Sequence, residues 1–147
     1  MRFHWLRLRA TAHPSEVPER VRQAVQTVSG LDDDAFAKVE DATRLDGHHG
    51  ADVTLLEATV TRSQDVRSWA RRIAADHAEA ILADLDARTD DDGVLYLRFE
   101  KQDAFAGRLV LTRGDDCVQV RLRPEVHPAS REAALDALGH WLRSGEA

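Results

Sequence analysis

The feature that most constrains the fold is a two-residue alternation near the start of the chain. Residues 3–11 read FHWLRLRAT, with mostly apolar side chains at even positions and aromatic or basic ones at odd positions. Successive side chains of an extended strand point to opposite faces, so the segment predicts a strand with one buried and one solvent-facing side. The solvent-facing side is expected to carry Trp5, Arg7 and Arg9.

The rest of the chain mixes such strands with apolar residues at helical spacing. Further strands are expected at 35–44, 53–61, 94–99, 108–112 and 117–123, the last two as a hairpin across Gly114-Asp115-Asp116. Helices are expected at 15–30, from 63 to the turn at 90–93, and at 128–142, with a short turn or helical hinge at 101–105.

The resulting order is β-α-β-β-α-β-β-β-α, with no repeat and no linker, so residues 1–147 are interpreted as one domain. This order predicts an α+β, two-layer sandwich, in which helices cover one face of an antiparallel sheet and the opposite face stays open.

The open face is where the alternation indicates a function. It is expected to present eight aromatic or basic side chains, namely Trp5, Arg7, Arg9, Tyr96, Arg98, Arg108, Arg121 and Arg123. Guanidinium groups pair with phosphates, and aromatic rings stack on unpaired bases, so this combination favours single-stranded or looped RNA as the ligand.

Two other uses of the same face remain open on the residues alone. The arginines can be solvated and paired with neighbouring acids such as Glu57 and Glu100. Alternatively, the face can bury against a protein partner or a second copy in a homodimer, because Trp, Tyr and Arg are also enriched at protein interfaces.

Composition narrows the class of protein. The 147 residues carry a formal net charge of −6, and their basic residues are 18 Arg and only 2 Lys. A negative net charge normally argues against nucleic acid, but the local distribution of charge decides. The preference for Arg and Asp is typical of a GC-rich genome, and it equally suits a halophile.

Motifs for other functions are missing from the sequence. There is no bilayer-spanning apolar run and no signal peptide, so a soluble, cytoplasmic protein that does not bind a membrane is expected. Cys117 is the only cysteine, which excludes a disulfide framework and a cysteine-based zinc site. Phosphate-loop, dinucleotide-binding, HExxH and GxSxG patterns are absent as well, so no cofactor, no metal and no enzymatic activity are expected.

The most unusual local sequence is Gly47-His48-His49-Gly50. Four uses remain open for its histidines: hydrogen bonds within a glycine-bounded turn, contact with an RNA backbone, acid–base chemistry and metal binding. Metal binding is the weakest, because adjacent histidines are poorly arranged to hold one ion and no Cys or HxxxH pattern completes a site.

Three segments together resemble a known family. They are Leu45-Asp46-Gly47-His48-His49-Gly50, then Leu95 to Ala104 (LYLRFEKQDA) leading to Gly107, and Gly114-Asp115-Asp116 followed by VQVRL. In this order they resemble the archaeal RNA-binding proteins described as predicted exosome subunits, whose domain is similar to a ribosomal-protein RNA-binding fold. The chain departs from the family pattern at Ala51-Asp52, where the family tends to have Asn-Pro.

The resemblance implies RNA binding without catalysis, alongside exosome or ribosome-associated proteins. It places interest on His48, His49, Lys101, Gln102 and Arg121, with the histidine loop and Lys101 at the rim of the open face. It also suits a haloarchaeal protein, in which an acidic composition and RNA binding coexist.

Overall fold

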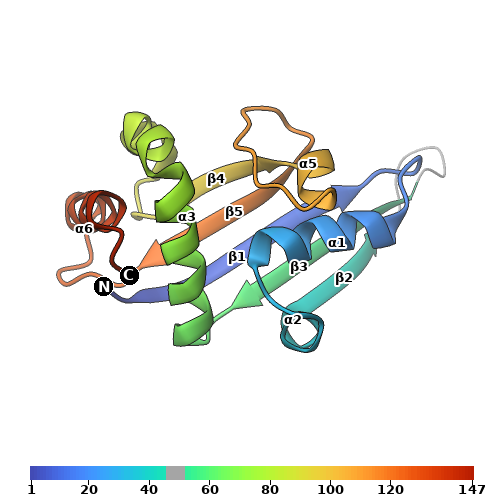
Figure 1. Ribbon diagram of the computed structural model, residues 1–147, viewed down its shortest axis with the longest axis horizontal. Helices are drawn as coiled ribbons and strands as arrows, with labels where there is room; N and C mark the ends of the chain where they lie inside the picture. Colours follow the sequence, from blue (N-terminus) through green and yellow to red (C-terminus); the bar gives the residue numbers. More distant parts are fainter. Residues whose placement is uncertain (46–51) are drawn as a thin grey trace. The chain divides into compact units, whose positions relative to one another are not determined.

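The computed structural model describes residues 1–45 and 52–147 (Figure 1). The elements follow one another as β1 (Phe3–Ala12), α1 (Pro18–Ser29), α2 (Asp33–Val39), β2 (Glu40–Leu45), β3 (Val53–Val60), α3 (Ser63–Ala83), α4 (Leu85–Arg88), β4 (Leu95–Glu100), α5 (Lys101–Phe105), β5 (Cys117–Pro124) and α6 (Arg131–Ser144).

The described strands form a five-stranded antiparallel sheet in the order β2-β3-β1-β5-β4. β2 and β3 pair in a register that joins Glu40 to Ala58 and Leu45 to Val53. The predicted α+β class with an antiparallel sheet is therefore confirmed, and β1 lies at the centre of the strand order.

The chain divides into two compact units, each built from separated segments. The first unit comprises residues 1–6, 60–97 and 121–147, and the second comprises residues 7–59 and 98–120.

In the second unit, α1 packs against α5. The helix α1 buries Val21, Val25 and Val28, which recur at helical spacing, and it ends at Gly30 in the left-handed conformation with φ 72°. These valines are part of the apolar core, to which the buried side chains of the strands also contribute.

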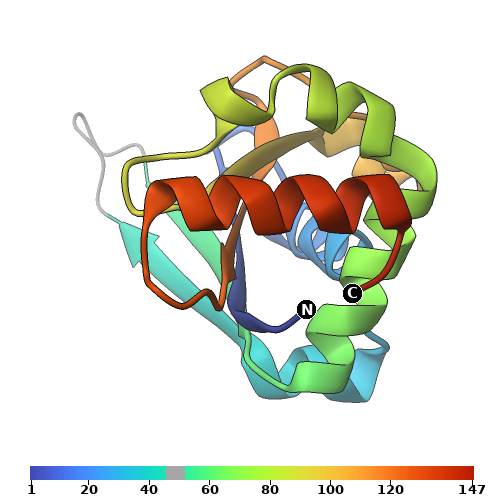
Figure 2. The ribbon, with the colours of Figure 1, turned by 90° about the vertical axis from the view of Figure 1, so that its left-hand side faces the viewer.

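In the first unit, α3 packs against α6 (Figure 2). Trp69 of α3 and Trp141 of α6 are both buried, and the Trp141 indole Nε1 donates a hydrogen bond to the Ala70 carbonyl oxygen at 3.1 Å. Phe3 meets the Trp141 ring edge to face, with 5.6 Å between the ring centroids. A buried indole needs such a polar partner, so these contacts fix how the two helices pack.

The predicted strand at 35–44 is wrong in its first half. Asp32 caps a helix instead, because its carboxylate accepts a hydrogen bond from the Ala35 N–H at 2.8 Å. Asp33 and Asp34 then lie in the first turn of α2, where the helix dipole favours negative charge. The strand begins only at Glu40.

The predicted strand at 108–112 and its hairpin with 117–123 are also wrong. Leu111 forms a single antiparallel bridge with Phe99, so this segment pairs with β4 rather than with β5. Backbone hydrogen bonds from Glu100 to the Val110 carbonyl (2.8 Å) and from Thr112 to the Arg98 carbonyl (2.9 Å) hold it there. β5 itself forms where it was expected.

Across the described ranges, no helix is long and apolar enough to cross a membrane.

Candidate nucleic-acid interface

The side chains of β1, β4 and β5 alternate between buried and solvent-facing as the sequence predicts. The even-numbered Leu6, Leu8 and Ala10 of β1 are buried, and so are Leu95, Leu97 and Phe99 of β4 and Val118, Val120 and Leu122 of β5. The residues between them are exposed or half-buried, among them Trp5, Arg7, Arg9, Tyr96, Arg98, Arg121 and Arg123. The predicted registers are confirmed for β4, for β5 and for β1 from Leu6 onward, whereas the even-numbered His4 is exposed rather than buried.

In the second unit, several of these side chains surround one hollow of about 240 Å³. Arg9 of β1, Arg98 of β4 and Gln119 of β5 line it, together with His13 from the loop after β1. The hollow therefore brings two arginines that are 89 residues apart in sequence to the same place.

Arg98 is already engaged within this hollow. Its Nη1 donates to the Asp115 carboxylate at 2.9 Å and to the Arg113 carbonyl oxygen at 3.3 Å. Glu100, which was considered as a partner for the strand arginines, caps α5 instead by accepting from the Asp103 N–H at 2.5 Å.

In the first unit, an aromatic ring and a guanidinium group form a pair. The Arg121 guanidinium carbon lies over the Tyr96 ring, 5.7 Å from its centroid, so the neighbouring strands β5 and β4 bring a cation and an aromatic ring into contact. Arg123 follows on the same side of β5, and Trp5 is half-buried on β1.

The environment of Tyr96 disfavours ionisation of its phenol. Burial raises the pKa of Tyr96, and a hydrogen bond with Asp90 and the charge of that carboxylate raise it further. A neutral, oriented ring is suited to stacking on a base, since no phenolate charge opposes the phosphates nearby.

Comparison with known families now identifies the chain. A family model described as RNA binding matches residues 5–123, which is more than half of the sequence. The chain belongs to this RNA-binding family. The matched residues span all five strands of the sheet.

Three archaeal proteins are similar to this RNA-binding family member. The RNA-binding protein PAB1135 of Pyrococcus abyssi is 23% identical over 146 residues, covering 97% of this chain and 95% of that protein. Two DUF54 proteins of known structure are similar in fold. They are AF2318 from Archaeoglobus fulgidus (28% identity, TM-score 0.81, 96% of this chain and 99% of that chain) and Mth689 from Methanothermobacter thermautotrophicus (22%, TM-score 0.77, 100% of both chains).

Lys101, which the family resemblance placed at the rim of the RNA-binding face, is buried. Its side chain is 3% exposed. The ammonium donates to the Thr11 carbonyl oxygen at 2.9 Å and to Glu16 Oε1 at 3.0 Å, and it lies 2.6 Å from Asp116 Oδ1. The expected rim position is wrong, because this lysine ties the end of β1 to the start of α1 and to the loop before β5.

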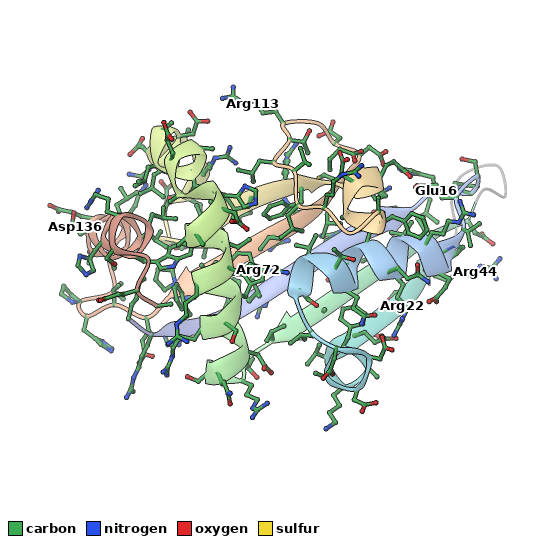
Figure 3. All side chains as sticks on the ribbon, viewed as in Figure 1. Glu16, Arg22, Arg44, Arg72, Arg113 and Asp136 are labelled. Carbon is green, nitrogen blue, oxygen red and sulfur yellow. The ribbon has the colours of Figure 1, made fainter. Side chains whose placement is uncertain are left out.

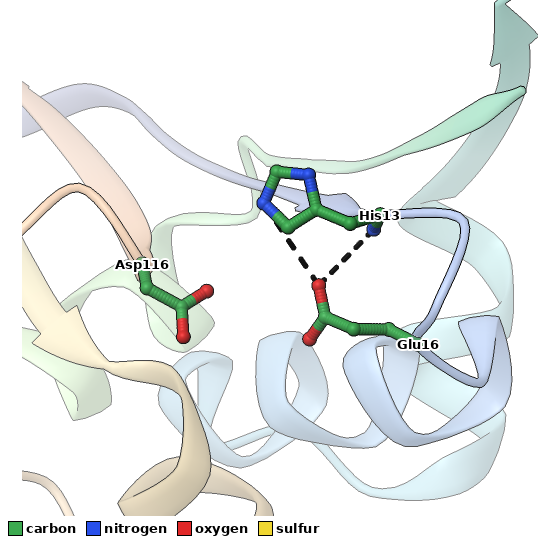
Figure 4. Close-up of side chains that lie close together, drawn as sticks. All are labelled: His13, Glu16 and Asp116. Atoms are coloured by element: carbon green, nitrogen blue, oxygen red, sulfur yellow. Dashed lines mark hydrogen bonds and ion pairs between the residues drawn. The ribbon is translucent and has the colours of Figure 1, made fainter. Parts of the chain in front are cut away.

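The carboxylates around Lys101 lie near His13, whose backbone N–H donates to Glu16 Oε1 at 3.1 Å (Figure 4). One donor atom from each of His13, Glu16 and Asp116 lies within 4.8 Å of the others, a spacing that suits a metal ion. The Lys101 ammonium is within 3.0 Å of both acids, so each carboxylate already has a cationic partner. We therefore assign the cluster a structural role.

The other expected site residues lie elsewhere. Arg108 is on the loop after α5 rather than on a strand, and its Nη2 pairs with Asp103 at 3.0 Å. Gln102 is exposed on α5, beside Val17 and Phe105 at a second hollow of about 200 Å³. His48 and His49 lie outside the described residues.

Cys117 lines the hollow of the second unit beside Arg98. Burial raises the pKa of its thiol, although the nearby arginine acts in the opposite direction. The thiol is therefore protonated at neutral pH, whereas a cysteine nucleophile must be a thiolate.

Sequence reasoning missed the partners of two cations. Glu16 lies 85 residues from Lys101, and Asp115 lies 17 residues from Arg98. The Gly114-Asp115-Asp116 turn was noticed as a motif, but no periodicity shows which cations its carboxylates meet.

Proposed function

We propose that this protein is a non-catalytic RNA-binding protein that acts with archaeal RNA-processing, RNA-degrading (exosome) or ribosome-associated machinery. RNA is bound on the solvent-facing sides of β1, β4 and β5. The contact residues are Arg7, Arg9 and Arg98 in the second unit and Trp5, Tyr96, Arg121 and Arg123 in the first.

One observation carries this proposal. In a chain whose formal net charge is −6, the solvent-facing positions of three strands hold arginines and two aromatic side chains. RNA backbones attract such local positive charge, and unpaired bases stack on rings and guanidinium planes. Membership of the RNA-binding family and the printed name of the P. abyssi relative support the same reading.

The deciding experiment is recovery of RNA crosslinked to the tagged protein in its own cells. We expect RNA to be recovered with the wild type. A variant with Arg7→Glu and Arg121→Glu should recover about tenfold less RNA, or less still. Each reversal replaces a charge-assisted hydrogen bond to phosphate with repulsion.

A matched variant, Arg67→Glu with Arg71→Glu, makes the same change in net charge on the exposed side of α3. It should recover RNA as the wild type does. If the wild type recovers none above background, the RNA proposal fails, and the same residues are then assigned to a protein or homodimer interface. Equal losses in both variants would show a general charge effect.

The stacking role of Tyr96 makes a separate prediction. Tyr96→Ala should weaken binding to a pool of random 20-nucleotide single-stranded RNAs by about 1–3 kcal/mol, the range for one stacked base. Fluorescence anisotropy of the labelled pool measures it. Tyr96→Phe keeps the ring and should bind like the wild type, whereas an unchanged affinity in Tyr96→Ala would remove stacking at this ring.

A further inference from the structure

The hollow of the second unit contains an ion pair between two side chains that differ in their exposure to solvent. Arg98 belongs to β4, and its side chain is 40% exposed, whereas the Asp115 side chain in the loop before β5 is 99% exposed. Within the described residues, the Asp115 carboxylate has a single ion-pair partner, Arg98 Nη1 at 2.9 Å. Such an exposed pair is weak and easily exchanged.

The neighbouring aspartate is held quite differently. Asp116 lies 2.6 Å from the Lys101 ammonium, whose side chain is 3% exposed. Two consecutive carboxylates of one loop therefore have distinct roles: Asp116 secures the loop, and Asp115 reaches out to the arginine that faces the hollow.

The remaining lining suits an anion. The Arg9 side chain has neither a hydrogen bond nor an ion pair within the part of the chain that the structure describes, and Gln119 adds a side-chain amide. The volume of about 240 Å³ is roughly eight times the share of one water molecule in the liquid, which is ample for a phosphate group. Two guanidinium groups facing one small hollow are a typical arrangement for binding phosphate.

We infer that this hollow is a phosphate site for RNA, and that Asp115 occupies the place of the phosphate on Arg98 until RNA displaces it. The inference rests on the proposed function and adds to it that Asp115 and an RNA phosphate compete for Arg98. The internal carboxylate keeps Arg98 paired and oriented in the free protein, and it lowers the affinity for RNA because its ion pair must be broken.

Removal of the competing carboxylate should strengthen RNA binding. In Asp115→Asn the side chain keeps its shape and loses its charge, so Arg98 meets the RNA phosphate without competition. We expect the dissociation constant for the random 20-nucleotide RNA pool to fall about two- to fivefold, the range that corresponds to one exposed ion pair.

A double-mutant cycle separates this competition from a general change in charge. In an Arg98→Gln background, Asp115→Asn should give no gain, because the arginine for which the carboxylate competes is gone. Asp136→Asn, on the exposed side of α6 (Figure 3), makes the same change in net charge and should leave the affinity of the wild type unchanged.

The outcomes distinguish the inference from the proposed function. A wild type that fails to bind the RNA pool overturns both. If the wild type binds and Asp115→Asn is no tighter, or is tighter by the same factor in the Arg98→Gln background, the competition is refuted while RNA binding stands. A gain confined to the background that retains Arg98 supports the inference.

Discussion

Replacing Lys101 with methionine lowers the free energy of unfolding by about 3 kcal/mol, because the substitution removes the cation that three separate segments share. Methionine fills a similar volume, so the loss arises from the polar partners. The Thr11 carbonyl loses its donor, and Glu16 and Asp116 are left as like charges facing each other. Asp116 is 58% exposed, and its solvation keeps the cost below that of a fully buried pair. Urea unfolding measures the change.

Lys38, the only other lysine of the chain, supplies the control. It is exposed in the last turn of α2, so Lys38→Met should change stability by less than about 0.5 kcal/mol. Equal stabilities of the two variants would contradict the assigned role of Lys101.

The same ammonium gives the stability a dependence on alkaline pH. Burial acts to lower the pKa of Lys101, but its hydrogen bonds to Asp116 and Glu16 outweigh burial and raise the pKa above the ordinary 10.5. A raised pKa in the folded state means that the contribution is complete below pH 10.5 and is lost as the pH rises through the folded-state value. This loss should be absent in Lys101→Met.

Gly93→Ala destabilises the protein by about 3 kcal/mol, for two reasons that lie in the first unit. Gly93 has φ +82°, a conformation that alanine adopts only with strain, and it closes the turn before β4 by donating its N–H to the Asp90 carbonyl at 3.0 Å. An added Cβ would lie 2.6 Å from the Ala134 Cβ of α6, which is closer than non-bonded carbon atoms approach one another, so α6 or the turn would have to shift. Thermal unfolding followed by circular dichroism measures the effect.

A second substitution divides the cost into its two causes. Ala134→Gly removes the atom that the new methyl group would meet. This substitution alone should lower the free energy of unfolding by about 1 kcal/mol, because glycine is unfavourable inside a helix. The double variant Gly93→Ala with Ala134→Gly should then be less destabilised than the sum of the single variants, with the conformational strain remaining. Simple additivity would show that the close approach of the turn to α6 contributes nothing.

Much of the fold could be predicted because its signals are local. The alternation in β1, β4 and β5 follows from a strand period of two residues, and the helical spacing of Val21, Val25 and Val28 follows from the period of α1. The confirmed solvent-facing positions are therefore properties of short stretches of sequence. The antiparallel α+β class follows in turn from the order of these stretches.

The errors arose at two segments where the local pattern was misleading. Residues 35–44 were expected to form a charge-rich strand, whereas Asp32 caps a helix that takes up the residues as far as Val39. At 108–112, the glycine turn at 114–116 predicted a hairpin with β5. In the structure, backbone groups of β4 hold the segment instead, as the Glu100–Val110 and Thr112–Arg98 hydrogen bonds show.

By itself, the sequence determined which side chains of the strands face solvent, because alternation fixes the face of a residue without knowledge of its neighbours. Only the tertiary structure decided which of the cations are available to a ligand. Lys101 and Arg98 look equivalent in sequence, but Lys101 is enclosed by carboxylates from distant segments, whereas Arg98 holds one exposed carboxylate beside an open hollow. The charge of a residue follows from its type, but its counter-ion depends on the packing of segments that lie up to 85 residues apart in sequence.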